Sequence, residues 1–432
     1  MRVLVVGGGG REHALVDAIS RDQGVKVFCA PGNAGIAAQA ELVNLNSDDV
    51  LHLLRFVDDS KIDLTVVGPE QPLAVGIVDT FESKGKKIFG PRKLAARLET
   101  SKVFAKEFMK RWKIPTAEFR SFTIQQREEL LAYLNGAKYP LVLKADGLAA
   151  GKGVSIVESA KDAEGELERL FVKKIFGGAG ERVVVEDFMA GVEASVFAIT
   201  DGKDYVVLPP AQDHKRAGDG DTGKNTGGMG AFAPTPFVGE SEMAAIKSSV
   251  IEKVISATAA EGFPFKGCLY CGMMLTSDGP KVVEFNARFG DPETQAVLQL
   301  LDSSLLELLE ASASRKVGSY NLKLNSSASV CIIAASKGYP DYHESGKEIS
   351  GLEMKSDTSK VFHSGTKLSG GKIVTSGGRV IGVTGTDPGG RIKKAAEIAY
   401  DRLRGIRYDG MFYRHDIGKK ASDLEAMKGQ SS

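Results

Sequence analysis

The chain has 432 residues, more than one ordinary hydrophobic core accommodates, so its length predicts two to four domains. Its 56 lysines and arginines and 55 aspartates and glutamates leave a net charge of +1, which argues against a broad nucleic-acid surface and a polybasic membrane patch. No stretch of about 18 apolar residues occurs, and the apolar start of MRVLVVGGGG is too short for a signal peptide. These features predict a cytoplasmic enzyme, and a mature organellar form would look the same.

Residues 1–101 alternate short apolar runs with amphipathic segments. The runs RVLVVG, VKVFCA, DLTVVG and KIFGP are typical of strands, whereas REHALVDAIS and PLAVGIVDTFESKG are typical of helices. This βαβ pattern predicts a doubly wound parallel sheet. The next predicted helix begins after Ser101, a plausible N-cap, and is expected to stop at Pro115.

The first glycine-rich turn lies in VLVVGGGGREHAL. Gly7 and Gly9 fit the dinucleotide-binding pattern G-x-G-x-x-G, but Glu12 stands at its third glycine and no acidic residue follows the second strand. NAD binding, and with it a dehydrogenase, is therefore disfavoured. The turn could instead hold one phosphate at the helix N-terminus, with the loops PGNAG and VGPEQPL at the same sheet edge. The alternative is a set of tight turns without a ligand.

A second glycine-rich segment, PLVLKADGLAAGKGVSIVE, differs from a Walker A loop. Only three residues precede Gly151 after the previous glycine, Gly153 instead of a hydroxyl follows Lys152, and the next stretch is strand-like. We therefore expect a glycine hairpin between two strands, which could fold over phosphates and exclude water. Lys144, in the strand before it, could place an ammonium on a phosphate oxygen.

Lys102 and Lys106 share a face of the preceding helix because they are four residues apart. The sequence allows two interpretations of this pair: the lysines contact a phosphate, or they lie on an ordinary solvent-exposed face of the helix. Further on, RVVVEDFMAGVEASVFAITDG predicts two apolar strands joined by an acidic link. Free backbone groups at this crossover could recognise an adenine edge, with Glu193 near a ribose.

The segment KVVEFNARFGDPETQ ends an apolar strand in a group of charged side chains. Glu284 and Asn286 share one face of that strand, and their carboxylate and amide oxygens suit Mg²⁺ completed by waters and substrate phosphates. Arg288 could hold a carboxylate or phosphate through two parallel bonds, and Asp291 could hold an ammonium. These sites together predict a reaction between ATP and an amino acid. The alternative is a polar strand end in solvent.

Residues 209–232, PPAQDHKRAGDGDTGKNTGGMGAF, are too polar and glycine-rich for a core, so a long functional loop is expected. His214 is predicted to make a structural or substrate contact, because no second histidine lies nearby to share a metal. The segment GCLYCGMML predicts a strand with buried thiols at Cys268 and Cys271, since no other Cys or His completes a zinc site.

The motifs GGGGREHAL, PGNAG, TVVGPE, KADGLAAGKGV, QDHKR, NTGGMGAF and EFNARFGDPETQ occur in this order over nearly the whole chain. They resemble the glycinamide ribonucleotide synthetases, the phosphoribosylamine–glycine ligases of the ATP-grasp superfamily. The resemblance implies an α/β and α+β multidomain protein. Its units would be an N-terminal doubly wound domain (1–101), an ATP-grasp central domain (102–120 and 191–325) with a mobile lid (121–190), and a C-terminal β-rich domain (326–432).

The resemblance implies ATP-dependent joining of glycine to 5-phosphoribosylamine through a glycyl phosphate, a step of purine biosynthesis, with Mg²⁺ or Mn²⁺ as cofactor. Implied site residues are Asp213, Lys215, Arg288 and Asp291 for catalysis; Lys106, Lys144, Gly151, Lys152, Gly153, Glu186, Phe188 and Glu193 for ATP; Gly8, Gly9, Gly10, Arg11, Glu12, Asn33 and Glu70 for phosphoribosylamine; and Glu284 and Asn286 for the metal.

One residue departs from the family pattern. Lys224 stands where the family motif GPNTGGMG has proline, which frees φ at that turn and predicts a more mobile loop. A monomer or weak homo-oligomer without nucleic-acid or membrane partners is expected. The alternatives are another ATP-grasp carboxylate–amine ligase and a nucleotide-binding protein without turnover.

Overall fold

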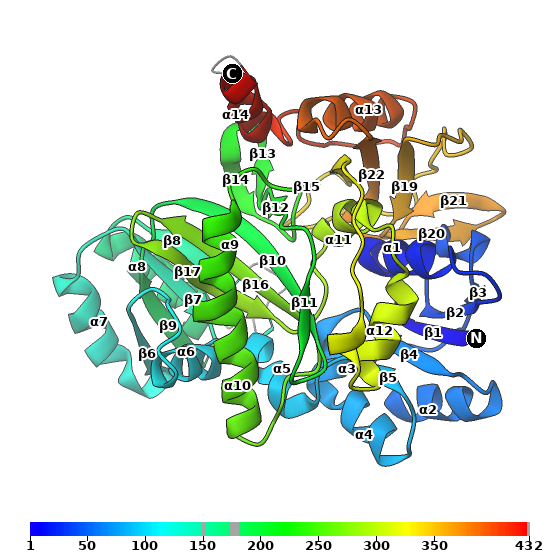
Figure 1. Ribbon diagram of the computed structural model, residues 1–432. Coiled ribbons are helices and arrows are strands. Elements are labelled where there is room, and N and C mark those ends of the chain that lie inside the picture. Colours follow the sequence, from blue (N-terminus) through cyan, green and yellow to red (C-terminus); the bar gives the residue numbers. More distant parts are fainter. Residues whose placement is uncertain (149–152, 173–180, 430–432) are drawn as a thin grey trace.

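The computed structural model describes residues 1–148, 153–172 and 181–429, so Gly151 and Lys152 of the predicted phosphate flap lie outside the described residues. Four larger sheets organise the described chain: one parallel and three antiparallel. Figure 1 shows the N-terminal sheet in blue, the lid in cyan, the central strands in green and the strands of the C-terminal segment in ochre, orange and brown.

The N-terminal sheet is parallel, with strand order β3-β2-β1-β4-β5. Successive residues of its first strand face two different cores, since Val3 and Val5 belong to one cluster and Leu4 and Val6 to another. This confirms the doubly wound prediction. The predicted helix of PLAVGIVDTFESKG is two helices, because Gly76 between them adopts φ 93°. The elements are β1 (Arg2–Gly7), α1 (Gly10–Ile19), β2 (Lys26–Pro31), β3 (Glu41–Leu42), α2 (Val50–Asp59), β4 (Leu64–Val67), α3 (Glu70–Val75), α4 (Ile77–Ser83), β5 (Ile88–Phe89) and α5 (Lys93–Thr100).

The lid consists of an antiparallel sheet with strand order β6-β9-β7-β8. Its apolar side chains form a separate core that runs from Phe122 to Val185 and includes no buried residue of the other sheets. Strands β7 and β8 pair antiparallel, as the predicted glycine hairpin requires. The elements are β6 (Phe119–Thr123), α7 (Arg127–Gly136), β7 (Leu141–Ala145), β8 (Val154–Val157), α8 (Ala160–Leu167) and β9 (Arg182–Asp187).

The central sheet has strand order β11-β10-β16-β17, so the successive strands β9 and β10 belong to different sheets and residues 188–191 cross between them. Ser101 is the N-cap of α6, as predicted, and accepts a hydrogen bond from the Phe104 N–H. That helix ends at Arg111, earlier than expected from Pro115. The elements are α6 (Lys102–Arg111), β10 (Val192–Thr200), β11 (Tyr205–Val207), α9 (Glu240–Ile246), α10 (Glu252–Ala260), β16 (Gly267–Thr276), β17 (Gly279–Asn286), α11 (Glu293–Val297) and α12 (Leu305–Ala313).

The predicted strand with two cysteines is β16. Cys268 and Cys271 are free and buried, and they face different hydrophobic cores, as their three-residue spacing in a strand requires. Burial raises the pKa of both thiols. The prediction of buried thiols is confirmed.

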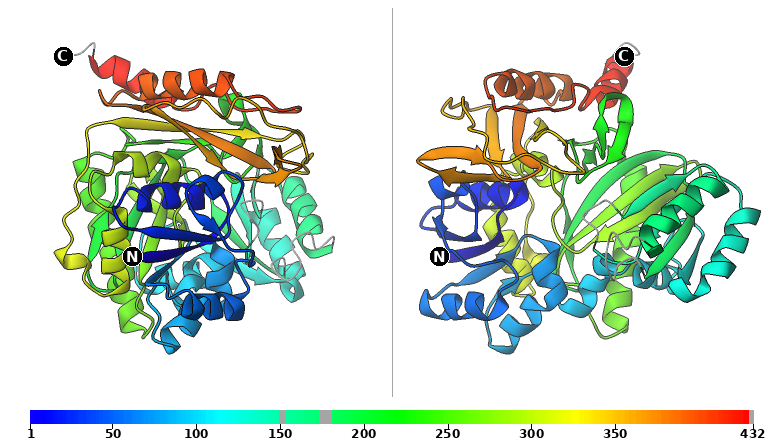
Figure 2. Two further views of the ribbon diagram at one scale, coloured as in Figure 1. Left: turned by 90° about the vertical axis from the view of Figure 1, so that its right-hand side faces the viewer. Right: turned by 180° about the vertical axis from the view of Figure 1, so that it is seen from behind.

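The C-terminal sheet has strand order β12-β15-β18-β22-β19 and therefore includes two strands from the segment expected to be a loop. That expectation was wrong: Met229, Ala231 and Phe232 are fully buried, because the apolar end of the segment pairs with β18. The elements are β12 (Gln212–Asp213), β13 (Arg216–Gly218), β14 (Thr222–Asn225), β15 (Gly230–Ala233), β18 (Ala328–Ala335), β19 (Ser359–His363), β20 (Thr366–Ser369), β21 (Lys372–Thr375), β22 (Arg379–Asp387), α13 (Ile392–Arg404) and α14 (Lys419–Gly429). Figure 2 shows α13 lying along the outer side of this sheet.

Candidate active site

A cavity of about 650 Å³ lies where the four larger parts of the fold meet. Its wall contains many of the residues predicted from separate motifs. They are Arg11 and Glu70 from helices of the N-terminal unit; Lys144, Gly153 and Phe188 from the lid and its crossover; Asp213 and Lys215 from β12 and the residues after it; and Glu193, Glu284, Asn286, Arg288 and Asp291 from the central strands and the loop after β17. Other predicted residues do not line this cavity: Gly8, Gly9, Gly10, Glu12, Asn33, Lys106 and Glu186.

Two predicted ATP lysines share one buried carboxylate. Lys106 lies 2.9 Å and Lys144 3.0 Å from the Glu186 carboxylate oxygens, and all three side chains are almost fully buried. Burial lowers the pKa of Lys106 to about 8, although Glu186 opposes the shift. Only Lys144 of the three reaches the main cavity, where its Nζ also donates to the Val283 carbonyl at 2.9 Å. The side chain of Glu186 therefore acts as a counterion beneath the cavity.

The crossover between β9 and β10 contributes an apolar wall. Phe188 is 43% exposed, and with Met189 and Gly191 it lines the cavity on the side of the lid hairpin. An exposed aromatic ring beside free backbone is a suitable surface for a flat heteroaromatic ring. This position agrees with the predicted adenine contact, which stays a prediction.

The predicted metal residues, Glu284 and Asn286, are two residues apart on β17, and both line the cavity. Burial alone would raise the pKa of Glu284, but the charges of Lys215, Lys102 and Lys144 lower it to about 2. Among the described residues, neither the Glu284 nor the Asn286 side chain makes a hydrogen bond, and the nearest ion partner, Lys102, is 4.0 Å from Glu284. An ionised carboxylate and a free amide oxygen fit a divalent metal that keeps waters and phosphates as its other ligands.

A partly exposed polar network also lines the cavity. Lys215 donates to Glu193 at 2.8 Å, so this glutamate is held by a cation and does not stand alone beside a ribose site. Burial raises the pKa of Asp213 to about 8, against the opposing effect of Lys215. His214, between them in sequence, is buried on Phe232 with a pKa that burial lowers to about 4, in line with a structural role.

Arg288 is already paired within the chain. Its Nε lies 3.2 Å from Glu70 and its Nη2 2.8 Å from Glu99, whose pKa is raised by burial. Burial would also raise the pKa of Glu70, but Arg288 and Arg11 lower it to about 2. The predicted two-bond clamp for a substrate anion is thus occupied by two protein carboxylates, and Arg288 contributes mainly to the local charge balance.

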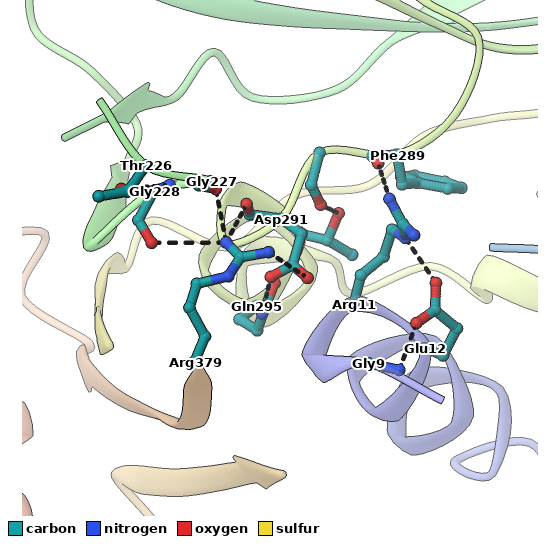
Figure 3. Close-up of polar contacts among 12 residues, drawn as sticks. Gly9, Arg11, Glu12, Thr226, Gly227, Gly228, Phe289, Asp291, Gln295 and Arg379 are labelled. Atoms are coloured by element: carbon teal, nitrogen blue, oxygen red, sulfur yellow. Dashed lines mark hydrogen bonds and ion pairs between the residues drawn. The ribbon is translucent and has the colours of Figure 1, made fainter. Parts of the chain in front are cut away.

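Asp291 is held from both sides. Gln295 donates to its Oδ1 at 2.7 Å, and the Arg379 guanidinium lies 3.0 Å from its Oδ2 (Figure 3). Although burial would raise it, the pKa of Asp291 is lowered, chiefly by Arg379 and Arg11. The carboxylate is therefore ionised and faces the cavity, as an ammonium site requires.

The first glycine loop is filled by the chain itself. Glu12 folds back so that its Oε2 accepts from the Gly9 N–H at 2.6 Å, and its Oε1 accepts from Arg11 (Figure 3). Asn33 donates to the Gly8 and His363 carbonyls, which leaves it inside the packing between the N-terminal and C-terminal units. The anion expected at this helix N-terminus is thus supplied by Glu12, and only Arg11 turns from the loop into the cavity.

Several cavity residues were missed from the sequence. Tyr270 lines the cavity and shares a 2.9 Å hydrogen bond with Ser195, which donates in turn to Glu293 at 3.0 Å. Glu99 was signalled only by its place on the apolar face of α5, which also buries Ala95, Ala96 and Leu98. Arg379 carried no signal, because it stands alone in SGGRVIG, 88 residues after Asp291.

Three family comparisons cover most of the chain. Residues 1–99 match the N domain, 100–294 the ATP-grasp (A) domain and 329–420 the C domain of phosphoribosylglycinamide synthetase. The chain is 48% identical over 418 residues to phosphoribosylamine–glycine ligase of Caldanaerobacter subterraneus, covering 96% of this chain and 99% of that one. It is 45% identical over 433 residues to the enzyme of the same name from Vibrio vulnificus, covering 99% and 100%.

Solved structures give the same result. Phosphoribosylamine–glycine ligase from Thermotoga maritima superposes with a TM-score of 0.84 at 33% identity, covering 96% of this chain and all of that one. A biotin carboxylase from Campylobacter jejuni superposes with a TM-score of 0.72 at 15% identity, which shows the shared fold alone.

The fold and the cavity define an ATP-grasp enzyme, in which two antiparallel sheets face one another across a site of lysines and acidic side chains. The chain belongs to the phosphoribosylglycinamide synthetase family, and it is an ATP-dependent ligase that uses a divalent metal. The family and the fold class predicted from the sequence are confirmed. No helix in the described parts of the chain is long and apolar enough to cross a membrane.

Proposed function

We propose that this ligase joins glycine to 5-phosphoribosylamine with ATP, forming glycinamide ribonucleotide, ADP and phosphate. A glycine carboxylate oxygen attacks the γ-phosphorus of ATP, ADP leaves, and a glycyl phosphate results. The amine nitrogen of phosphoribosylamine then attacks the carbonyl carbon and loses a proton, and the bond to phosphate breaks. The names of the Caldanaerobacter and Vibrio relatives support this pair of substrates.

The observation that supports this proposal most is the meeting of opposite charges in one cavity. The carboxylate of Asp291, suited to an ammonium, shares the cavity with Lys144 and Lys215, which suit phosphates. Holding the reactants in line can contribute up to about 7–11 kcal/mol to lowering the barrier. Phosphoryl transfer depends mainly on such positioning and on charge neutralisation, so no nucleophilic side chain is required.

Glu284 and Asn286 would hold Mg²⁺ or Mn²⁺. When bound there, the metal would neutralise charge on the ATP phosphates. Residues of the chain supply the other contributions. Lys144 and Lys215 orient the anions, and the β7–β8 hairpin and Phe188 limit the access of water to the phosphorylated intermediate.

The test is ADP release with Mg²⁺ and ATP, adding glycine and freshly made phosphoribosylamine singly and together. Full ADP release is expected only when both are present. Alanine in place of glycine, and ammonia in place of phosphoribosylamine, test whether the enzyme is instead an ATP-grasp carboxylate–amine ligase for other substrates. Folded protein that binds ATP but releases no ADP under any combination would contradict the proposal and favour a nucleotide-binding protein without turnover.

A further inference from the structure

Arg379 enters the cavity wall from the first residue of β22, in the C-terminal sheet. Its Nη1 donates to the Gly227 carbonyl at 2.5 Å and to the Asp291 carbonyl at 2.7 Å, and lies 3.4 Å from the Gly228 carbonyl. Its Nη2 lies 3.0 Å from Asp291 Oδ2. Figure 3 shows the guanidinium reaching across to the glycine turn and to the loop before α11. One cation thus joins segments of the central unit to the C-terminal sheet.

These contacts fix the direction of a carboxylate that faces the cavity. Gln295 occupies one oxygen of Asp291 and Arg379 the other. Each carboxylate oxygen has about two lone-pair sites, so both oxygens keep acceptor capacity toward the cavity. A guanidinium fork holds such a group in one orientation, whereas a flexible ammonium would not.

The glycine turn beside Asp291 depends on the same support. Three carbonyl oxygens converge on the Arg379 guanidinium, and without its positive charge their dipoles would repel. The Gly227 N–H is held by the Tyr339 hydroxyl at 3.0 Å, also from the C-terminal unit. A Cβ on Gly228 would lie 2.5 Å from Pro292, so the turn packs directly on the segment after Asp291.

We propose that Arg379 is a positioning residue for the ligase reaction: it orients the Asp291 carboxylate to receive the amino group of glycine and holds the Gly227–Gly228 turn beside it. The inference rests on the proposed function, since it assigns the ammonium of glycine to Asp291. On this assignment, the C-terminal sheet contributes a residue to the glycine site, and ATP binding does not depend on Arg379.

The test compares substitutions of Arg379, at the start of β22, with substitutions of Arg391, just after the end of that strand, and of Tyr339. Arg379→Met removes the guanidinium at similar side-chain length, and Arg379→Lys keeps the charge without the fork. Arg391→Met is the matched control, because Arg391 pairs with Asp387 at the far end of β22 and does not line the cavity. Tyr339→Phe removes only the hydroxyl bound to the Gly227 N–H. ADP release at varied glycine and the Kd of ATP are measured for each protein.

Arg379→Met is expected to lower kcat/KM for glycine about 100-fold, with Arg379→Lys in between, while the Kd of ATP changes less than about twofold. Tyr339→Phe is expected to lower kcat/KM for glycine several-fold, and Arg391→Met to leave it unchanged. If the Arg379→Met protein does not fold, the glycine kinetics of the Arg379→Lys and Tyr339→Phe proteins test the inference instead. Unchanged glycine kinetics in these variants, or equal losses for glycine and ATP, would overturn the inference. A wild-type protein without glycine-dependent ADP release would instead overturn the proposed function, and the inference with it.

Discussion

Several charged side chains of the site are oriented by other residues of the chain. Arg288 and Asp291 each have two partners, whereas Glu284 and Asn286 make no hydrogen bond among the described residues. Preorganised groups of this kind lower the reorganisation needed during reaction. This pair on β17, whose side chains make no hydrogen bond among the described residues, is therefore the place where an added ligand has most to contribute.

Glu284→Gln should weaken the metal site without altering its shape. We expect the Mg²⁺ concentration for half-maximal ADP release to rise at least about tenfold, because an amide replaces the only carboxylate of the pair. Asp278→Asn is the control, since Asp278 is an exposed carboxylate in the turn before β17. A Glu284→Gln enzyme with full activity at limiting Mg²⁺ would remove the metal assignment.

His13 gives a prediction for stability at acid pH. Burial, and then the neighbouring His363, lower the pKa of His13 to about 3, and the His363 N–H donates to its Nδ1 at 2.8 Å. Between pH 6.5 and about 3 the unfolded chain therefore binds a proton that the folded chain does not. The free energy of unfolding should fall with falling pH by about 1.4 kcal/mol per pH unit from this residue.

His13→Asn isolates that contribution, because the Asn Oδ1 can still accept from His363 but does not titrate. Urea unfolding between pH 6 and 4 should give a pH dependence shallower by about one proton than in the wild type. Equal slopes for the two proteins would show that His13 is protonated in the folded state over this range.

The site residues that could be predicted from the sequence are those whose role follows from their spacing within one helix or strand. Glu284 and Asn286 were found because two residues in a strand share a face. Arg379 was not, since its role depends on a contact with Asp291 that only the tertiary fold creates. The phosphate interpretation of the first glycine loop overlooked Glu12 as an internal anion, which local sequence rules do not distinguish from a solvent-exposed acid.

At the scale of elements, alternating apolar runs predicted most strands correctly. Short strands in polar, glycine-rich segments were instead predicted to be loops. β12 and β15 were missed because each has few residues, and because β18, the second partner of β15, lies far along the chain. Between them, the β13–β14 hairpin is fastened to the C-terminal segment. Arg414, with a side chain 1% exposed, binds Asp416, Asp221 and the Arg216 carbonyl.

Two anchors of this hairpin should differ in strength. Arg414→Met should cost about 2–3 kcal/mol of unfolding free energy, somewhat less than the loss for a fully buried pair, because Asp221 and Asp416 keep contact with water. Lys224→Ala should cost less than about 1 kcal/mol, since Lys224 and its partner Asp341 are both exposed. Denaturant unfolding with hydrogen exchange over residues 216–225 would measure both. A larger effect of Lys224→Ala would contradict this ranking.

At the scale of the whole molecule, the units are joined by shared sheets and shared cores. Phe232 packs in the C-terminal core although it lies nearly a hundred residues before β18, and Cys331 packs with residues of the N-terminal sheet. The lid differs, because its core contains only residues between Phe122 and Val185. The proposed lid is thus the part most able to move as a body.

A fragment of residues 1–325 should therefore fail as an enzyme. It keeps β15 but lacks β18, so Phe232 would be exposed, and it also lacks Arg379. We expect poor solubility and no ADP release, with both restored when residues 326–432 are co-expressed. The matched comparison is a full chain cleaved at the same junction after folding, which should stay active. A soluble, active 1–325 fragment would show that the C-terminal sheet is dispensable.

The pairing of β15 with β18 also means that, during synthesis, β15 is complete well before its partner strand has been made. About 95 residues separate the end of β15 at Ala233 from the start of β18 at Ala328. At about 5–20 residues per second, the ribosome needs roughly 5–19 s to supply the missing strand. For that interval the growing chain carries an apolar strand edge without its neighbour, so this part of the nascent protein is where a chaperone would have most to protect.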